Sequence, residues 1–233
     1  VGGCLMNIKN LLVTYSKRGH MIGYSHQRYF AAQGVDVTPC YIDETPYWTD
    51  WSHRLPFYVT KGVPVTVREM ERRAGKRFDA VIEVDSPGQH HLWGMRGFDG
   101  PKLLWSMDTH IDHKQRFQQY IQRDFDKVFT CHKDYTDKFS QVPSEWLPVA
   151  FDPDFHKPLN LPRIYDLAFV GNADAKVYPE RAEWLGRLSK KFKVGIFSNI
   201  FGEETVKVWN QTKIAFNRSF SGDLNHRVFE VMG

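Results

Sequence analysis

The feature that most constrains the fold is an alternation of short apolar runs with helix-like segments. Residues 8–14 form an apolar run that favours a strand, and a helical pattern over 21–33 ends at Gly34, a common helix stop. Residues 35–42 then favour a second strand. Because strand–helix–strand units build parallel sheets, the pattern predicts an α/β fold of the doubly wound type.

The same alternation continues, pauses at a proline-rich segment and then restarts. The further strands are predicted at 78–84, 102–107, 127–131 and 145–149, and the helices at 64–74, 112–125 and 132–139. After the proline-rich segment 151–163, strands are predicted at 165–170, 193–197 and 214–216, and helices at 179–191 and 203–210. We therefore expect two Rossmann-like domains, 1–157 and 158–233, the second one truncated after three strands.

Composition excludes several classes of protein. A net charge of +4 over 233 residues is too weak, and too evenly spread, to predict nucleic-acid binding. Three widely spaced cysteines without a C-x-x-C pair indicate free thiols in a reducing compartment, so we expect a cytoplasmic protein. No apolar run approaches the length of a membrane span, which predicts the absence of a transmembrane segment.

The C-terminal stretch 213–233 places charged residues on one side of a predicted helix. At 100° per residue Asp223, Arg227 and Glu230 share that side, and Asp223 is placed to cap the helix. The opposite side is apolar and is expected to dock on the sheet; it carries Leu224, Val228, Val231 and Met232. Spacing alone leaves two interpretations open. The first is a surface Arg227–Glu230 pair, and the second is a ligand site in which the cation meets phosphate and the carboxylate meets ribose.

Three segments resemble one enzyme family, the CgeB/spore-maturation-type glycosyltransferases, which have the GT-B fold. The most specific is N-R-S-x(5)-N-x-R-V-F-E-V-M-G over 217–233. The others are YDLAFVGN over 165–172 and WLPVAFDP over 146–153. Together they cover roughly the last ninety residues, whereas the N-terminal half matches in its general α/β pattern.

The resemblance implies transfer of a sugar from a nucleotide-diphosphate sugar to a glycan, glycolipid or protein acceptor, without a metal or other cofactor and with retention of configuration. Glu230 aligns with the carboxylate that holds the ribose, and Gly222 stands where distant relatives carry a glutamate near the sugar. Gly171 would let the backbone approach the diphosphate, and Lys176 or Arg181 would neutralise it; a plain surface charge is the alternative for Arg181. The candidate donor residues are Gly171, Asn172, Arg181, Asn217, Asp223, Asn225, Arg227 and Glu230.

Polar residues that follow two predicted strands are the candidates for the acceptor side. His90 follows the strand at 78–84, and Asp108 and His110 follow the strand at 102–107. A carboxylate or imidazole there could take the proton of an acceptor hydroxyl, so these three are the candidate catalytic residues. Caps and loop hydrogen bonds are the alternative roles. The cluster over 110–113 does not place its histidines and aspartate on one helical face, so no metal site is predicted.

Two rival functions remain open at the sequence level. One is another sugar-nucleotide enzyme of the epimerase type, which would need no acceptor. The other is a nucleotide-binding α/β protein without turnover. Because Gly233 falls within the family motif, the chain is expected to be a truncated form that is inactive by itself.

Overall fold

The computed structural model describes residues 8–16, 22–42, 57–58, 65–85, 91–218 and 224–232. The chain divides into two compact parts, Val1–Pro148 and Val149–Gly233, which we call unit 1 and unit 2. The candidate residues His90 and Asp223 lie outside the described residues.

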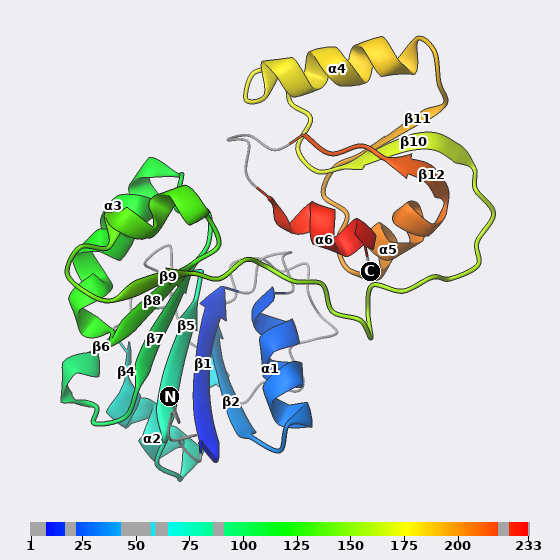
Figure 1. Ribbon diagram of the computed structural model, residues 1–233. Helices are drawn as coiled ribbons and strands as arrows, with labels where there is room; N and C mark the ends of the chain where they lie inside the picture. Colours follow the sequence, from blue (N-terminus) through cyan, green and yellow to red (C-terminus); the bar gives the residue numbers. More distant parts are fainter. Residues whose placement is uncertain are drawn as a thin grey trace, which may run out of the picture. The chain divides into compact units, whose positions relative to one another are not determined.

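In the described part of unit 1, seven strands form one parallel sheet in the order β3-β2-β1-β5-β7-β8-β9 (Figure 1). The strands are β1 (Asn10–Ser16), β2 (Asp36–Ile42), β3 (Phe57–Tyr58), β5 (Ala80–Val84), β7 (Lys102–Ser106), β8 (Lys127–Thr130) and β9 (Ser144–Trp146). The chain runs outward from β1 in one direction, returns to β5 and then runs outward in the other direction. This reversal is the doubly wound, Rossmann-like arrangement that the sequence predicts.

Helices pack on both faces of this sheet, with α1 and α3 on opposite sides (Figure 1). The helices are α1 (Ile22–Ala32), α2 (Val67–Ala74) and α3 (Asp112–Ile121), with 3-10 turns η2 (Met95–Gly97), η3 (Gln122–Asp124) and η4 (Lys133–Lys138). A small parallel pair joins β4 (Val65–Thr66) to β6 (Leu92–Trp93). The helix predicted from residue 64 therefore begins later, because Val65 and Thr66 pair as a strand and the Thr66 hydroxyl caps α2 by accepting from Glu69 N–H.

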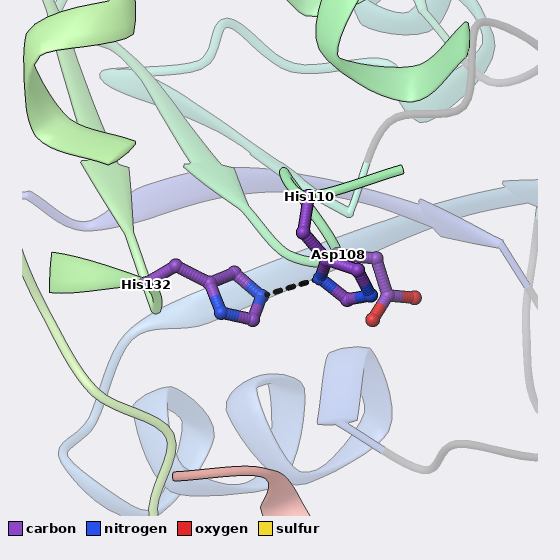
Figure 2. A group of neighbouring side chains, drawn as sticks. All are labelled: Asp108, His110 and His132. Atoms are coloured by element: carbon purple, nitrogen blue, oxygen red, sulfur yellow. Dashed lines mark hydrogen bonds between the residues drawn. The ribbon is translucent and has the colours of Figure 1, made fainter. Parts of the chain in front are cut away.

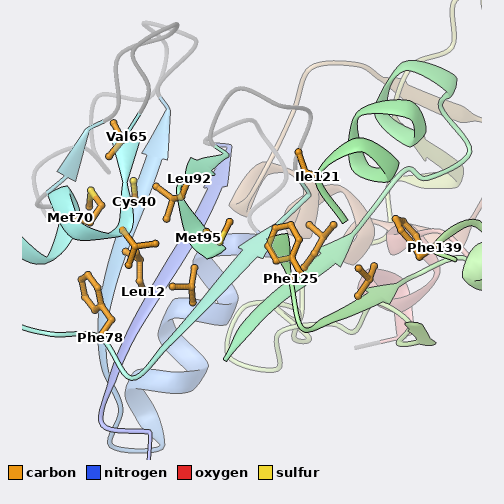
Figure 3. Packing of buried hydrophobic residues seen from close by; sticks show 14 residues of the cluster. Leu12, Cys40, Val65, Met70, Phe78, Leu92, Met95, Ile121, Phe125 and Phe139 are labelled. Atoms are coloured by element: carbon orange, nitrogen blue, oxygen red, sulfur yellow. The ribbon is translucent and has the colours of Figure 1, made fainter. Parts of the chain in front are cut away.

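The core of unit 1 lies on the face of the sheet that α2 and α3 cover, and its buried apolar side chains are drawn in Figure 3. Side chains alternate along each strand, so Leu12, Val81, Leu104 and Val128 face this core together. On the other face, the His26 ring of α1 packs edge-on against Trp105 at 4.4 Å. Both faces are therefore covered, as a parallel sheet requires.

Unit 2 repeats the plan on a smaller scale. Its described residues form a three-stranded parallel sheet in the order β11-β10-β12. The elements are β10 (Tyr165–Val170), α4 (Pro179–Ser189), β11 (Val194–Phe197), α5 (Glu203–Asn210), β12 (Thr212–Ala215) and α6 (His226–Met232). After β10 the chain adds β11 on one side and then β12 on the other, so the strand order reverses between β10 and β12. Open α/β sheets commonly bind ligands at such a reversal point.

The C-terminal helix α6 does not bury the apolar side expected from its sequence. Three of its four expected residues, Leu224, Val231 and Met232, are exposed, and the fourth, Val228, is only partly buried. The Arg227 and Glu230 side chains of the polar side are partly buried as well. The reason is local: Arg227 is held by Asn217 and by the ring of Phe169 at the end of the sheet, which turns the polar side inward. Among the helices of the described residues, none has the length and apolar character needed to cross a bilayer.

Candidate functional site

The reversal point of unit 2 is bordered by a glycine turn. Gly171 follows β10 with φ +143°, a backbone conformation that suits glycine. Its N–H donates to Phe197 O at 2.8 Å, and its carbonyl accepts from the Ser198 hydroxyl at 2.9 Å. These bonds join the turn to the end of β11. The turn is thereby fixed beside the ends of the strands.

Arg227 of α6 lies directly against this turn. Its guanidinium donates to Asn217 Oδ1 at 2.9 Å and stands over the Phe169 ring at 4.9 Å from the centroid. Asn225 donates to the same Asn217 oxygen at 3.1 Å. A Cβ atom added at Gly171 would clash with the Arg227 guanidinium. The missing side chain at 171 therefore makes room for the cation.

Arg181 of α4 brings a second guanidinium to the same ring. It is 8% exposed, and its charged group lies 5.2 Å from the Phe169 centroid and 4.1 Å from that of Tyr178. It donates to the backbone carbonyls of Asn172 at 2.7 Å and Arg218 at 2.9 Å. The sequence left open a plain surface charge at this position, and the burial of Arg181 excludes that role.

A buried guanidinium, that of Arg181, and a partly buried one, that of Arg227, place two positive charges at this end of the sheet. Burial lowers the pKa of Arg227 to about 10, and the charge of Arg181 acts in the same direction. Arg227 is still a cation at neutral pH. Burial also lowers the pKa of Arg181. Within the described part of the chain neither guanidinium forms an ion pair with a carboxylate, so an anionic ligand would be favoured here.

Glu230 lies one helical turn beyond Arg227 on α6. Its carboxylate contacts His226 Nδ1 at 2.9 Å, and the other ring nitrogen of His226 lies 3.1 Å from Ala150 O. Burial alone would raise the pKa of Glu230, but the His226 hydrogen bond and the charges of His156 and Arg227 hold it below its usual value. Glu230 is therefore an anion at neutral pH and does not form the surface pair with Arg227 that spacing suggested.

The structure thus brings the described donor-side candidates to one end of the unit 2 sheet. These residues are Gly171, Asn172, Arg181, Asn217, Asn225, Arg227 and Glu230. Sequence reasoning missed Phe169, whose ring contacts both guanidiniums, and His226, which orients Glu230. Phe169 gave no signal because it has the appearance of an ordinary strand residue.

A second polar cluster lies at the ends of β7 and β8 in unit 1 (Figure 2). Asp108 and His110 follow β7, and His132 follows β8. His110 Nδ1 and His132 Nε2 are 3.3 Å apart, and one suitable ligand atom from each of the three residues lies within 4.8 Å of the others. Two acceptor-side candidates, Asp108 and His110, are therefore neighbours in space and are joined by a histidine that the sequence analysis did not single out.

Lys114 of α3 ties two strand ends together beside this cluster. Its ammonium contacts Asp85 Oδ1 at 2.9 Å and Asp108 Oδ2 at 3.0 Å. Burial alone would lower the pKa of Lys114, but the two carboxylates raise it above its usual value. Both aspartates have positive φ, 52° at Asp85 and 50° at Asp108, a conformation that aspartate tolerates better than most residues. Asp108 is thus held as the partner of a cation.

Buried hydroxyl groups fix the backbone beneath the cluster. The Ser106 hydroxyl lies 2.6 Å from that of Thr109 and donates to Gln118 Oε1 at 2.7 Å. The Thr109 hydroxyl is 3.2 Å from that of Thr130, the last residue of β8. All four side chains are fully buried. The network therefore holds the turn after β7 against the end of β8, which sets the separation of His110 and His132.

His91 has a structural role in the core of unit 1. It is buried, and its Nδ1 lies 3.0 Å from a carboxylate oxygen of Glu83 in β5. Burial alone would lower the pKa of His91, but Glu83 and Asp124 raise it above its usual value. The pair satisfies a carboxylate that would otherwise be isolated in the core.

Fold and site together define an α/β protein with Rossmann-like parallel sheets and a cationic site at a strand-order reversal. A scan against protein-family models finds no matching model, and a search of curated proteins finds no significant match.

Proposed function

We propose that unit 2 binds a nucleotide-diphosphate sugar and that the protein is a glycosyltransferase. The sugar would pass to a glycan, lipid or protein acceptor, by a reaction that needs no metal at the donor and retains the anomeric configuration. The observation that carries the proposal is that two guanidiniums, those of Arg227 and Arg181, lie 4.9 Å and 5.2 Å from the centroid of the Phe169 ring, at the strand end next to Gly171.

Each side chain has a role that its chemistry supports. As the bond from sugar to diphosphate breaks, negative charge builds on the leaving diphosphate, and a fixed guanidinium stabilises that charge more than it stabilises the ground state. Arg227 and Arg181 are the groups for this task, and the absence of a side chain at Gly171 makes room for the Arg227 guanidinium. Glu230, an anion at neutral pH, accepts hydrogen bonds from the ribose hydroxyls.

The resemblance of residues 217–233 to the CgeB-type motif supports glycosyl transfer over other uses of a nucleotide. In that motif the carboxylate at the position of Glu230 holds the ribose. The side-chain placement agrees with this role, because Glu230 and Arg227 lie on the same side of α6. The agreement supports the proposal at the donor side.

Calorimetric titration of UDP, GDP, dTDP and CDP into the protein tests the proposal. We expect saturable binding of one diphosphate. Arg227→Met should weaken it about 10- to 100-fold, since hydrogen bonds to charged groups contribute about 1.5–3 kcal/mol. Glu230→Ala should weaken it through the ribose. The matched controls are Arg187→Met and Glu183→Ala, which remove an exposed pair on α4 and should leave binding unchanged.

Turnover is then measured with nucleotide-diphosphate sugars that contain the same base as the diphosphate that binds. Transfer to an added acceptor supports the glycosyltransferase, whereas epimerised sugar nucleotide without acceptor supports the epimerase-type rival. Absence of diphosphate binding, or equal binding by wild type and the Arg227 and Glu230 variants, would refute the nucleotide site.

A further inference from the structure

The strand-end cluster of unit 1 has the donor atoms of a transition-metal site. His110 and His132 contribute imidazole nitrogens, and Asp108 contributes a carboxylate (Figure 2). Imidazole suits zinc and its neighbours in the first transition row, whereas magnesium and calcium prefer sites made of oxygen atoms. Two nitrogens and one oxygen from three residues leave a fourth position for water, as in many open zinc sites.

The distance between the two imidazoles fits this interpretation. Zinc binds histidine nitrogen at about 2.0–2.1 Å, so two nitrogens on one tetrahedral ion lie roughly 3.3–3.4 Å apart. His110 Nδ1 and His132 Nε2 are separated by 3.3 Å. The Asp108 oxygen lies within 4.8 Å of both, and its side chain is half-exposed, so a change of its rotamer can bring the oxygen to the same ion.

The surroundings hold the ligands in place. The buried hydroxyls of Ser106, Thr109 and Thr130 fix the two strand ends that carry the histidines. Lys114 binds Oδ2 of Asp108 and so restricts the carboxylate, although its charge opposes that of a metal ion. Neutral histidines and one carboxylate give a modest site charge, so we expect affinity in the micromolar range, not the much tighter binding of thiolate sites.

We propose that Asp108, His110 and His132 bind a divalent transition metal of the zinc class. The site belongs to unit 1 and its residues differ from those of the nucleotide site, so the inference goes beyond the proposed function. It gives Asp108 and His110 a role as ligands in place of the acceptor-side acid–base role that the sequence predicted.

Metal titration without nucleotide tests the proposal. Chelator-treated protein is titrated with Zn²⁺ by calorimetry and with Co²⁺ by visible absorption, where d–d bands of a four- or five-coordinate ion report nitrogen and oxygen ligands. We expect one ion per chain, a higher unfolding temperature with Zn²⁺, and no comparable effect of Mg²⁺. His110→Ala and His132→Ala should each weaken binding by at least about tenfold.

The control is His226→Gln, which removes a histidine beside Glu230 in unit 2 and should leave Zn²⁺ binding unchanged. Circular dichroism of every variant separates lost ligands from lost folding, and His110→Gln and His132→Asn serve if the alanine variants do not fold. Unchanged affinity in folded His110 and His132 variants, or no binding by wild type, would overturn the site and leave the pair hydrogen-bonded. Binding lost in His226→Gln alone would overturn it as well.

Discussion

At the scale of single residues, the candidate donor site depends on a glycine, Gly171, at a position where any side chain would collide with Arg227. Arg227 reaches the turn after β10 because position 171 has no Cβ, and the turn itself has a backbone conformation that suits glycine. The same position therefore controls both the folding of the turn and the place of the cation.

Gly171→Ala should damage both properties. We expect a loss of about 1–3 kcal/mol in the free energy of unfolding, because alanine at φ +143° is strained. We also expect diphosphate binding to weaken about tenfold or more, because the new methyl group displaces the guanidinium of Arg227. Denaturant unfolding and calorimetry measure the two effects.

Gly186→Ala is the matched control on α4. A Cβ there meets nothing within 4 Å, and alanine is the better helix former, so this variant should be more stable by about 0.5–1 kcal/mol and bind as wild type does. Equal behaviour of the two variants would contradict the account of Gly171.

The residue scale also shows where sequence reasoning stops. Spacing assigned Arg227 and Glu230 to one side of a helix, and both do lie on it. Spacing along one segment could not bring His132 to His110, because they follow neighbouring strands and are 22 residues apart. The neighbours of His110 in space are therefore Asp108 and His132, whereas residues 110–113 are neighbours in sequence only.

At the scale of elements, an aromatic residue followed by an aspartate marks the start of three strands: the pair directly precedes β5 and β8 and forms the first two residues of β10. Asp79 precedes β5 and accepts from the backbone N–H groups of Lys9 and Asn10 at 2.8 Å each. Asp126 accepts from Lys102 N–H at 2.8 Å. Asp166 accepts from Lys193 N–H at 3.0 Å. Each carboxylate thus satisfies a backbone N–H at the start of a neighbouring strand or directly before it.

The contribution of the Asp79 hydrogen bonds to stability can be tested with Asp79→Ala, by measuring how the unfolding temperature of the variant and of the wild type depends on pH. Hydrogen bonds from Asn10 and Lys9 lower the pKa of Asp79 below its usual 3.8. A folded-state pKa below the unfolded one means that the contribution is full above pH 3.8 and is lost as the pH falls through the lower, folded value. We therefore expect Asp79→Ala to unfold at a lower temperature than wild type, by a constant interval from pH 7 to about 5.

Below that range the interval should shrink as Asp79 becomes protonated in the wild type. Asp137→Ala, which removes an exposed carboxylate of η4, serves as the control for charge. An interval that widens in acid, or an equal effect of Asp137→Ala, would argue against capping by Asp79.

Element prediction succeeded where a segment had a clear period and failed where tertiary contacts decided. The longer strands and helices lie within a few residues of their predicted positions, because apolar runs and helix stops are local signals. The pairs β4–β6 and β2–β3 are two residues long and carry no period of their own. The orientation of α6 could not be predicted from its own sequence, because it depends on contacts with Phe169 in β10 and with Asn217, which follows β12.

At the scale of the whole molecule, the two units place their candidate sites by the same rule. Each is a parallel sheet, and each has its polar cluster beyond the carboxyl ends of the strands: β10 and β12 in unit 2, β7 and β8 in unit 1. The functional groups of the two sites differ: the site of unit 2 contains two guanidiniums, whereas the site of unit 1 contains two imidazoles and a carboxylate. Two ligands of opposite charge should therefore bind to separate units.

Hydrogen exchange with mass spectrometry can separate the two ligands within one protein. Binding slows exchange in the segments whose local opening it opposes. The nucleoside diphosphate that binds best should protect peptides covering β10 and α6, and Zn²⁺ should protect peptides covering the turn after β7 and residues 130–134. At a ligand concentration near the wild-type Kd, Arg227→Met should reduce the diphosphate footprint and leave the zinc footprint unchanged, and His132→Ala should do the reverse. A diphosphate footprint on β7 and β8, or a zinc footprint on α6, would contradict the assignment of cation and anion sites to different units.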